Sequence, residues 1–138
     1  MSEDFDVIEK PKHYNSHPSG GECIEIIEWF PANLANAWKY LYRVGLKDEA
    51  IQEMSKALWY IKKELKRRTS LSRQQVLLDF YCPNKLNDSL RKFLKKESGK
   101  RREFFCHVFE AVANPTSNIN LKVAEKLLIE IIGETNAL

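Results

Sequence analysis

The stretch Asn36-Ala37-Trp38-Lys39-Tyr40-Leu41-Tyr42-Arg43 combines two helical periodicities, and the fold that we expect is built around it. An apolar set at i, i+3, i+4 and i+7 would face a core and consists of Leu34, Ala37, Trp38 and Leu41. A second set, one step round the helix, consists of Asn36, Lys39, Tyr40 and Arg43. Because side chains three and four apart are neighbours on a helix, this second set predicts one shared surface patch.

The residue types in this patch suit a phosphorylated ligand that carries a ring. Lysine offers a point charge, arginine a planar fork for phosphate oxygens, tyrosine a stacking face, and asparagine both a donor and an acceptor. The alternative is the ordinary solvated face of an amphipathic helix.

Two shorter segments precede this helix. Pro11, Pro18, Gly20 and Gly21 predict an extended arm over residues 1–21. Within the arm, His13 and Tyr14 would contact a ligand if the arm lies across the scaffold, and the alternative is a disordered terminus. Residues 22–30 show helical spacing, and Pro31 then redirects the chain. We expect Asn33 to cap the central helix, which would run to about Val44 and end at Gly45.

A second long helix is predicted from Glu49 to Arg68, with Asp48 as its cap. Its apolar stripe consists of Ala50, Met54, Ala57, Leu58, Ile61 and Leu65. Its other side carries Glu53, Lys56, Tyr60 and Lys63. Since the connection is short, the two helices should pack antiparallel, and a cleft between them is the predicted site. The basic end of this helix, from Lys62 to Arg68, complements the helix dipole or contacts phosphate.

Acidic and thiol groups raise the question of metal binding. Glu22, Glu25 and Glu28 recur three apart, and with Asp48 they could hold Mg²⁺ through Glu25, Glu28 or Asp48. The alternative is a solvated face near a helix N-terminus. The three cysteines, Cys23, Cys82 and Cys106, lack a paired spacing, which favours reduced thiols over a disulfide or metal site.

The C-terminal half also reads as helical. Apolar spacings predict a short helix after Ser72 and three further helices around Leu90, Val108 and Leu128, with a loop over residues 114–118. No alternating strand pattern stands out, so the predicted fold is all-α. We divide the chain into an arm (1–21), a helical nucleotide-binding core (22–68) and a C-terminal helical extension (69–138), and we expect a homo-oligomer.

Composition narrows the functional classes. The 138 residues carry a formal charge of +3, which allows anionic ligands but is mild for a dedicated nucleic-acid module. Seven basic residues between Arg91 and Arg102 could still contact nucleic acid or an acidic host protein, or form a solvated surface. No apolar run could cross a bilayer, and residues 1–10 do not resemble a signal peptide, so we expect a cytoplasmic protein.

Four ordered blocks over about residues 9–68 resemble a family of bacteriophage proteins that is commonly named nucleotide kinase. The blocks are Lys10-Pro11-Lys12-His13-Tyr14, Glu22-Cys23-Ile24-Glu25-Ile26-Ile27-Glu28, Asn36 to Asp48, and Lys56-Ala57-Leu58-Trp59-Tyr60. The resemblance implies deoxynucleotide metabolism in the cytoplasm of an infected bacterium. It also implies shared polar residues at His13, Tyr14, Glu22, Asn36, Lys39, Tyr40, Arg43, Lys47, Asp48, Lys56 and Tyr60.

The functional prediction is a nucleoside monophosphate kinase that lacks a phosphate-binding glycine loop, because the five glycines are scattered and no GxxxxGK[ST] sequence occurs. His13, Lys39 and Arg43 would act in catalysis. Nucleotide binding would use these three with Tyr14, Asn36, Tyr40, Lys47, Lys56 and Tyr60, and Mg²⁺ would be a cofactor only in the kinase. The same side chains would equally serve a sponge that sequesters a cyclic-nucleotide immune signal of the host. A nucleic-acid or host-protein binding module is the third hypothesis.

Overall fold

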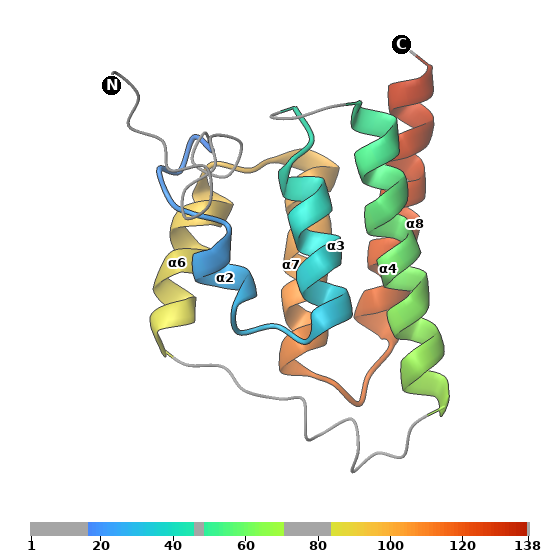
Figure 1. Cartoon of the computed structure of the whole chain (residues 1–138), viewed down its shortest axis with the longest axis horizontal. Helices are drawn as coiled ribbons and strands as arrows, with labels where there is room; N and C mark the ends of the chain where they lie inside the picture. The colour runs from blue at the N-terminus through green and yellow to red at the C-terminus, as the bar shows by residue number, and fades with distance from the viewer. Residues whose placement is uncertain (1–16, 46–48, 71–83, 138) are drawn as a thin grey trace, which may run out of the picture.

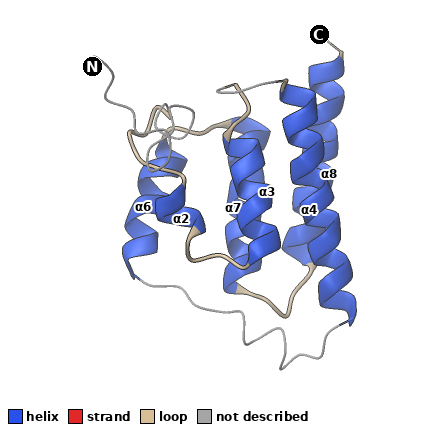
Figure 2. Cartoon of the chain, viewed as in Figure 1, coloured by secondary structure: helices blue, strands red, loops and turns tan. Residues whose placement is uncertain are grey.

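The computed structural model describes residues 17–45, 49–70 and 84–137 (Figure 1). Over these ranges the chain forms six α-helices and no strand, which confirms the predicted all-α class (Figure 2). The helices are α2 (Ile24–Ile27), α3 (Ala32–Tyr42), α4 (Ala50–Ser70), α6 (Asn84–Lys95), α7 (Gly99–Ala113) and α8 (Ile119–Asn136).

Four of these helices form a bundle. Helix α3 packs on α4, α4 on α8, α8 on α7, and α7 closes the ring against α3. In Figure 1, α3 and α4 form the front layer with α7 and α8 behind them, while α2 and α6 lie together beside the bundle. Helices α3 and α4 run antiparallel, as the short connection between them predicted.

One hydrophobic core joins both halves of the chain. The apolar set predicted on α3 is almost completely buried, at 0–1% exposed for Leu34, Ala37, Trp38 and Leu41. The Trp38 ring packs 4.5 Å from that of Phe105 on α7, measured between centroids. The hydrophobic core therefore contains residues of both the predicted nucleotide-binding segment (22–68) and the predicted C-terminal extension (69–138). The division of the chain into these two domains remains a prediction.

The ends of the helices near α3 differ in part from the prediction. Asn33 does not cap α3, because the helix begins at Ala32 with Pro31 in the cap position. Proline fits there, since its fixed φ suits a helix start and its missing N–H is not needed. Helix α3 ends at Tyr42 with Arg43 as its C-cap, two residues before the predicted end at Val44. Gly45 follows in the turn with a φ of +88°, which glycine adopts without strain.

Helix α2 is shorter than the predicted 22–30 and spans one turn. The chain leaves it through i→i+3 hydrogen bonds from Trp29 to Ile26 and from Phe30 to Ile27, tightening before Pro31. The predicted helix after Ser72 and the residue Cys82 lie outside the described residues, whereas the predicted loop over 114–118 is confirmed. Within the described ranges, no helix is long and apolar enough to cross a membrane.

Two buried carboxylates connect distant parts of the fold. Glu97, between α6 and α7, accepts a hydrogen bond from His17 Nε2 at 2.8 Å and another from Arg101 Nε at 2.7 Å. The Arg101 guanidinium also donates to the carbonyl oxygens of Tyr42 and Val44 at the end of α3. Burial acts to raise the pKa of Glu97, but the hydrogen bonds from His17 and Arg101 lower it below its ordinary value.

The second carboxylate is Glu64, which is fully buried on α4. It accepts hydrogen bonds from Asn33, Arg67 and Arg68 at 2.8–3.1 Å. Arg68 also donates to the carbonyl oxygen of Ala111 at 2.9 Å and so ties α4 to the end of α7. Burial acts to raise the pKa of Glu64, yet these donors hold it below its ordinary value.

Candidate functional site

The predicted polar patch forms around the ring of Tyr40. Three cations lie over this ring, with Lys39 Nζ 4.8 Å, Lys56 Nζ 5.3 Å and Arg43 Cζ 5.5 Å from its centroid. The ring of Tyr60 on α4 stacks against Tyr40 at 5.9 Å with an interplanar angle of 13°. We call these five residues the Tyr40 cluster.

Helix geometry explains why these five side chains meet. Lys39, Tyr40 and Arg43 lie within one turn of α3, and Lys56 and Tyr60 are four apart on α4. Because the two helices are antiparallel neighbours, the end of α3 faces the beginning of α4. The structure thus brings together the predicted residues of both helices. Asn36, also predicted for the site, is half-buried one turn before Tyr40.

The sequence analysis placed Glu53 on the polar side of the second helix and did not assign it to the site, but the structure buries this residue beside Arg43 and Lys56. Glu53 is fully buried, with Oε2 3.2 Å from Arg43 Nε and Oε1 3.3 Å from Lys56 Nζ. Within the described part of the chain, neither Arg43 Nε nor Glu53 Oε2 has a hydrogen-bond partner of good geometry. The burial of Glu53 could have been inferred from its position in the sequence, since it lies close to the apolar Ala50, Met54 and Ala57 on the helix surface.

The charges of the Tyr40 cluster and Glu53 do not balance. Three cations stand against one carboxylate, and the Arg43 side chain is only 10% exposed while that of Lys56 is 44% exposed. Arg43 is therefore a buried, oriented cation rather than the freely solvated one that a surface patch implies. Cations gathered on an aromatic face suit an anionic ligand with a ring, because the phosphate and the ring then have separate partners.

Cys23 lies near this cluster but is not suited to act as a nucleophile. Burial raises the pKa of its thiol to about 12, although the charges of Lys39 and Arg43 act to lower it. The side chain is 1% exposed and belongs to the core. Cys23 and Cys106 are both free thiols, as the sequence predicted.

The predicted magnesium ligands are only partly described. Glu25 and Glu28 are both exposed, and the Glu25 carboxylate accepts a hydrogen bond from the backbone N–H of Glu22 at 2.8 Å. Among the described residues there is no group of three side chains suited to hold a metal ion. Asp48, the third predicted ligand, lies outside the described residues, as do His13, Tyr14 and Lys47. Their roles remain predictions.

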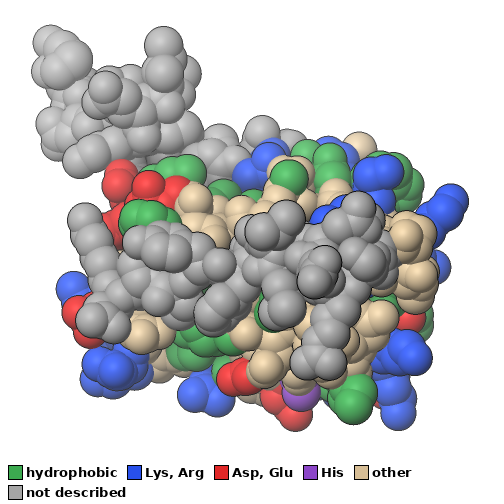
Figure 3. Space-filling model, turned by 90° about the horizontal axis from the view of Figure 1, so that it is seen from below, with side chains coloured by type: hydrophobic (Ala, Val, Ile, Leu, Met, Phe, Trp, Pro, Cys, Tyr) green, Lys and Arg blue, Asp and Glu red, His purple; other side chains and the backbone are tan. Residues whose placement is uncertain are grey.

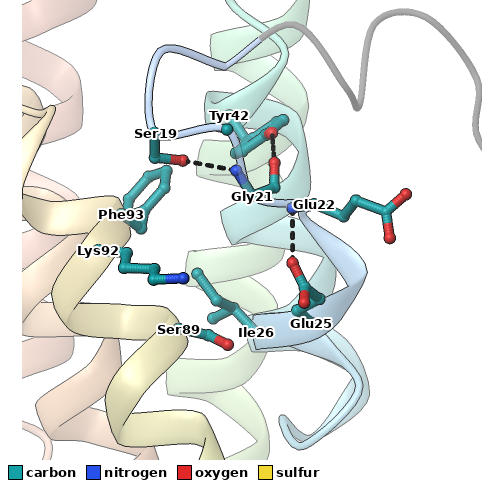
Figure 4. Close-up of a pocket in the computed structure, with 10 residues that line it drawn as sticks. Ser19, Gly21, Glu22, Glu25, Ile26, Tyr42, Ser89, Lys92 and Phe93 are labelled. Atoms are coloured by element: carbon teal, nitrogen blue, oxygen red, sulfur yellow. Dashed lines mark hydrogen bonds between the residues drawn. The ribbon is translucent and has the colours of Figure 1, made fainter.

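A separate pocket of about 180 Å³ lies between α2 and α6 (Figure 4). Glu25 and Lys92 are the charged side chains that line it, while the carboxylate of Glu22 points away from it (Figure 4). Tyr42 Oη donates to the Gly21 carbonyl oxygen at 3.4 Å, and Ser19 Oγ accepts from the Gly21 N–H at 3.2 Å. Because the pocket offers one lysine and also a carboxylate, that of Glu25, it is less suited to phosphate than the Tyr40 cluster is.

The basic run from Arg91 to Arg102 is partly engaged inside the protein. Arg101 binds Glu97 and the end of α3, Lys100 pairs with Glu134, and Arg91 Nη1 lies 3.5 Å from Asp88 Oδ1. Lys95 and Lys96 are exposed.

Comparison with known proteins gives one match. No curated protein and no solved structure matches the chain. Residues 8–62 match the model of a protein family described as of unknown function, DUF3310. The match covers α2, α3 and the first part of α4, and so includes every residue of the Tyr40 cluster. Over this segment, the chain is similar to a family whose activity the description leaves open.

Proposed function

We propose that the Tyr40 cluster binds a phosphorylated nucleotide. The observation that carries this proposal is the convergence of three cations within 5.5 Å of one tyrosine ring. Lys39, Arg43 and Lys56 would contact phosphate oxygens, and the ring of Tyr40 or Tyr60 would contact the base.

The incomplete hydrogen bonding of Arg43 and Glu53 supports a ligand at this position. A buried polar group without a well-aligned partner costs free energy, so such groups occur where another group completes them. A phosphate beside Arg43 would supply acceptors to the guanidinium and would offset the excess positive charge.

Phosphoryl transfer is the second candidate. Such transfer depends mainly on positioning and charge neutralisation, which three cations could provide. It also needs an oriented acceptor, for which the predicted residue is His13, and in general a bound Mg²⁺, for which the predicted ligands are Glu25, Glu28 or Asp48. We therefore propose nucleotide binding without chemical change, as in a sponge, as the first candidate. Phosphoryl transfer is one of the outcomes that the experiment distinguishes.

The experiment incubates the protein with ATP, Mg²⁺, deoxynucleoside monophosphates and cyclic nucleotides, then analyses the filtrate before and after heat denaturation. We expect one nucleotide to be missing from the first filtrate and to be recovered intact on heating. New diphosphates with loss of ATP would instead establish a kinase. The proposal would be overturned if no nucleotide were missing from the first filtrate and no new diphosphate were formed.

Variants connect the result to the cluster. Arg43→Ala should abolish retention while the helical circular-dichroism signal persists. Lys56→Gln should weaken binding about tenfold, the effect of losing one charge-assisted hydrogen bond. Lys62→Gln is the matched control, because Lys62 is an exposed lysine on another face of the same helix. Unchanged affinity in a folded Arg43→Ala protein would remove the Tyr40 cluster from consideration.

A further inference from the structure

A second basic pocket lies at the opposite end of the α3–α4 pair. It has a volume of about 260 Å³ and is lined by Asn33, Lys63, Lys66, Arg67 and Ser70. Three of these five side chains are cations and none is a carboxylate. Arg67 is paired with Glu64, but Glu64 is also paired with Arg68, so the surroundings keep a net positive charge. We call this the lower pocket.

The lower pocket and the Tyr40 cluster lie on one face of the helix pair. On α3 the stripe at i, i+3, i+7 and i+10 consists of Asn33, Asn36, Tyr40 and Arg43. On α4 the stripe at i, i+4, i+7 and i+11 consists of Lys56, Tyr60, Lys63 and Arg67. The antiparallel packing sets the two stripes side by side, with Tyr40 against Tyr60 and Asn33 against Glu64 near Arg67.

The separation of the two cationic ends exceeds the reach of a single phosphate group. From Lys56 to Arg67 the helix advances about 16 Å, at about 1.5 Å per residue. Aromatic rings lie between the ends. Trp59 is 57% exposed, contacts Tyr60 edge to face at 4.9 Å, and has Lys63 Nζ 5.2 Å from its centroid. Cations and rings thus alternate along α4.

The acidic groups of α4 do not oppose an anion on this face. The helix carries two glutamates, Glu53 and Glu64, and both are 0% exposed and paired with cations. The solvent-facing charges of the α4 stripe are therefore all positive. In the view from the lower end of the bundle, basic side chains are visible at the edge where α4 ends (Figure 3).

We propose that the α3–α4 face binds a short single-stranded oligonucleotide. Its phosphates would contact cations of both the Tyr40 cluster and the lower pocket, and its bases would stack on Tyr60 and Trp59. Alternating basic and aromatic side chains are the usual means of holding a single strand without reading its sequence. This inference rests on the proposed function, because the Tyr40 cluster takes one nucleotide of the strand.

The first test is the dependence of affinity on length. The full chain is titrated with fluorescent oligothymidylates of two to eight nucleotides at low salt, and thymidine monophosphate is measured by competition. Affinity should rise at least tenfold from one nucleotide to about four, the length that fills the face, and then level off. Equal affinity at every length would overturn the inference.

The second test is a pair of double variants. Lys63→Gln with Lys66→Gln should weaken the binding of a six-nucleotide strand at least tenfold and reduce the salt slope by about 1.4, the loss of two phosphate contacts. Competition by the mononucleotide should stay unchanged. Lys95→Gln with Lys96→Gln, two exposed lysines at and just after the end of α6, is the matched control and should change neither value.

The outcomes separate the two proposals. Suppose that the mononucleotide binds, but that affinity depends neither on oligonucleotide length nor on Lys63 and Lys66. The oligonucleotide inference then fails and the proposed function stands. If oligonucleotides bind and a folded Arg43→Ala protein binds them equally well, the Tyr40 cluster and both proposals fail. An equal loss in the Lys95/Lys96 control would move the strand to residues 91–102 and overturn the inference.

Discussion

Helix α4 carries two buried glutamates, and their surroundings differ. Glu64 accepts hydrogen bonds from three side chains, and its partner Arg68 is itself bound to a backbone carbonyl of α7. Glu53 lies near two cations at 3.2–3.3 Å, but its Oε2 and Arg43 Nε have no well-aligned hydrogen bond in the described structure. The first carboxylate completes a structural network, whereas the second accepts a hydrogen bond from Lys56 at 3.3 Å but leaves Arg43 Nε without one.

The difference separates stability from function on one helix. A fully bonded ion network stabilises one arrangement of the chain, since breaking it leaves an uncompensated buried charge. A loosely bonded one keeps charge available for another partner. We therefore expect Glu64 to serve mainly the fold and Glu53 to serve the proposed ligand site.

The largest expected effect is on stability at Glu64. Glu64→Gln leaves the buried Arg68 guanidinium without its charge partner and should lower the free energy of unfolding by about 3–5 kcal/mol. Urea denaturation followed by circular dichroism measures this loss. Glu53→Gln should cost only about 1–2 kcal/mol, because its partners are nearer to solvent and poorly aligned with it. Equal losses in the two variants would break the comparison.

A smaller effect is expected on ligand binding at Glu53. Glu53→Gln removes the negative charge beside Arg43 and Lys56, so nucleotide affinity should rise about fivefold, or roughly 1 kcal/mol. Glu64→Gln, measured under conditions in which it is folded, should leave mononucleotide affinity unchanged. Calorimetric titration with the nucleotide identified by filtration would measure both. Weaker binding in Glu53→Gln would mean that the carboxylate serves the site mainly by positioning its cations.

The smallest effect is on the pH dependence of stability. The pKa values of Glu64 and Glu97 are lower in the folded protein than their ordinary value of 4.5. Each carboxylate therefore contributes stability that is present above about pH 4.5 and is lost as the pH falls through the folded value. Denaturation between pH 6 and pH 3 should show a steep decline that is shallower in Glu64→Gln. An unchanged slope in that variant would remove the charge of Glu64 from the network.

Much of the fold was predictable from spacing. The apolar stripe of α3 is buried as expected, and its polar stripe meets Lys56 and Tyr60 because both helices keep a regular period. The cap of α3 was wrong, since Pro31 and not Asn33 begins the helix. Asn33 instead serves Glu64, a contact 31 residues away that leaves no mark in the local sequence.

Charged residues on buried faces account for most of what was missed. Glu53, Glu64 and Arg68 are buried beside the apolar stripe of α4, and a buried charge requires a partner. The identity of the partner depends on tertiary packing, as with Arg68 and the Ala111 carbonyl. The contact between His17 and Glu97 joins residues that are 80 positions apart, so it could not be predicted from local sequence either.

The packing of Trp38 against Phe105 has a consequence for the order of folding. The two rings lie 4.5 Å apart but belong to helices that are separated by about half of the chain. During synthesis α3 emerges with Trp38 unburied, and the loop that closes onto Phe105 is long and entropically costly. We expect the helix pair that carries the Tyr40 cluster to gain its native packing only after α7 has left the ribosome. The candidate binding face is therefore encoded early in the chain and assembled late.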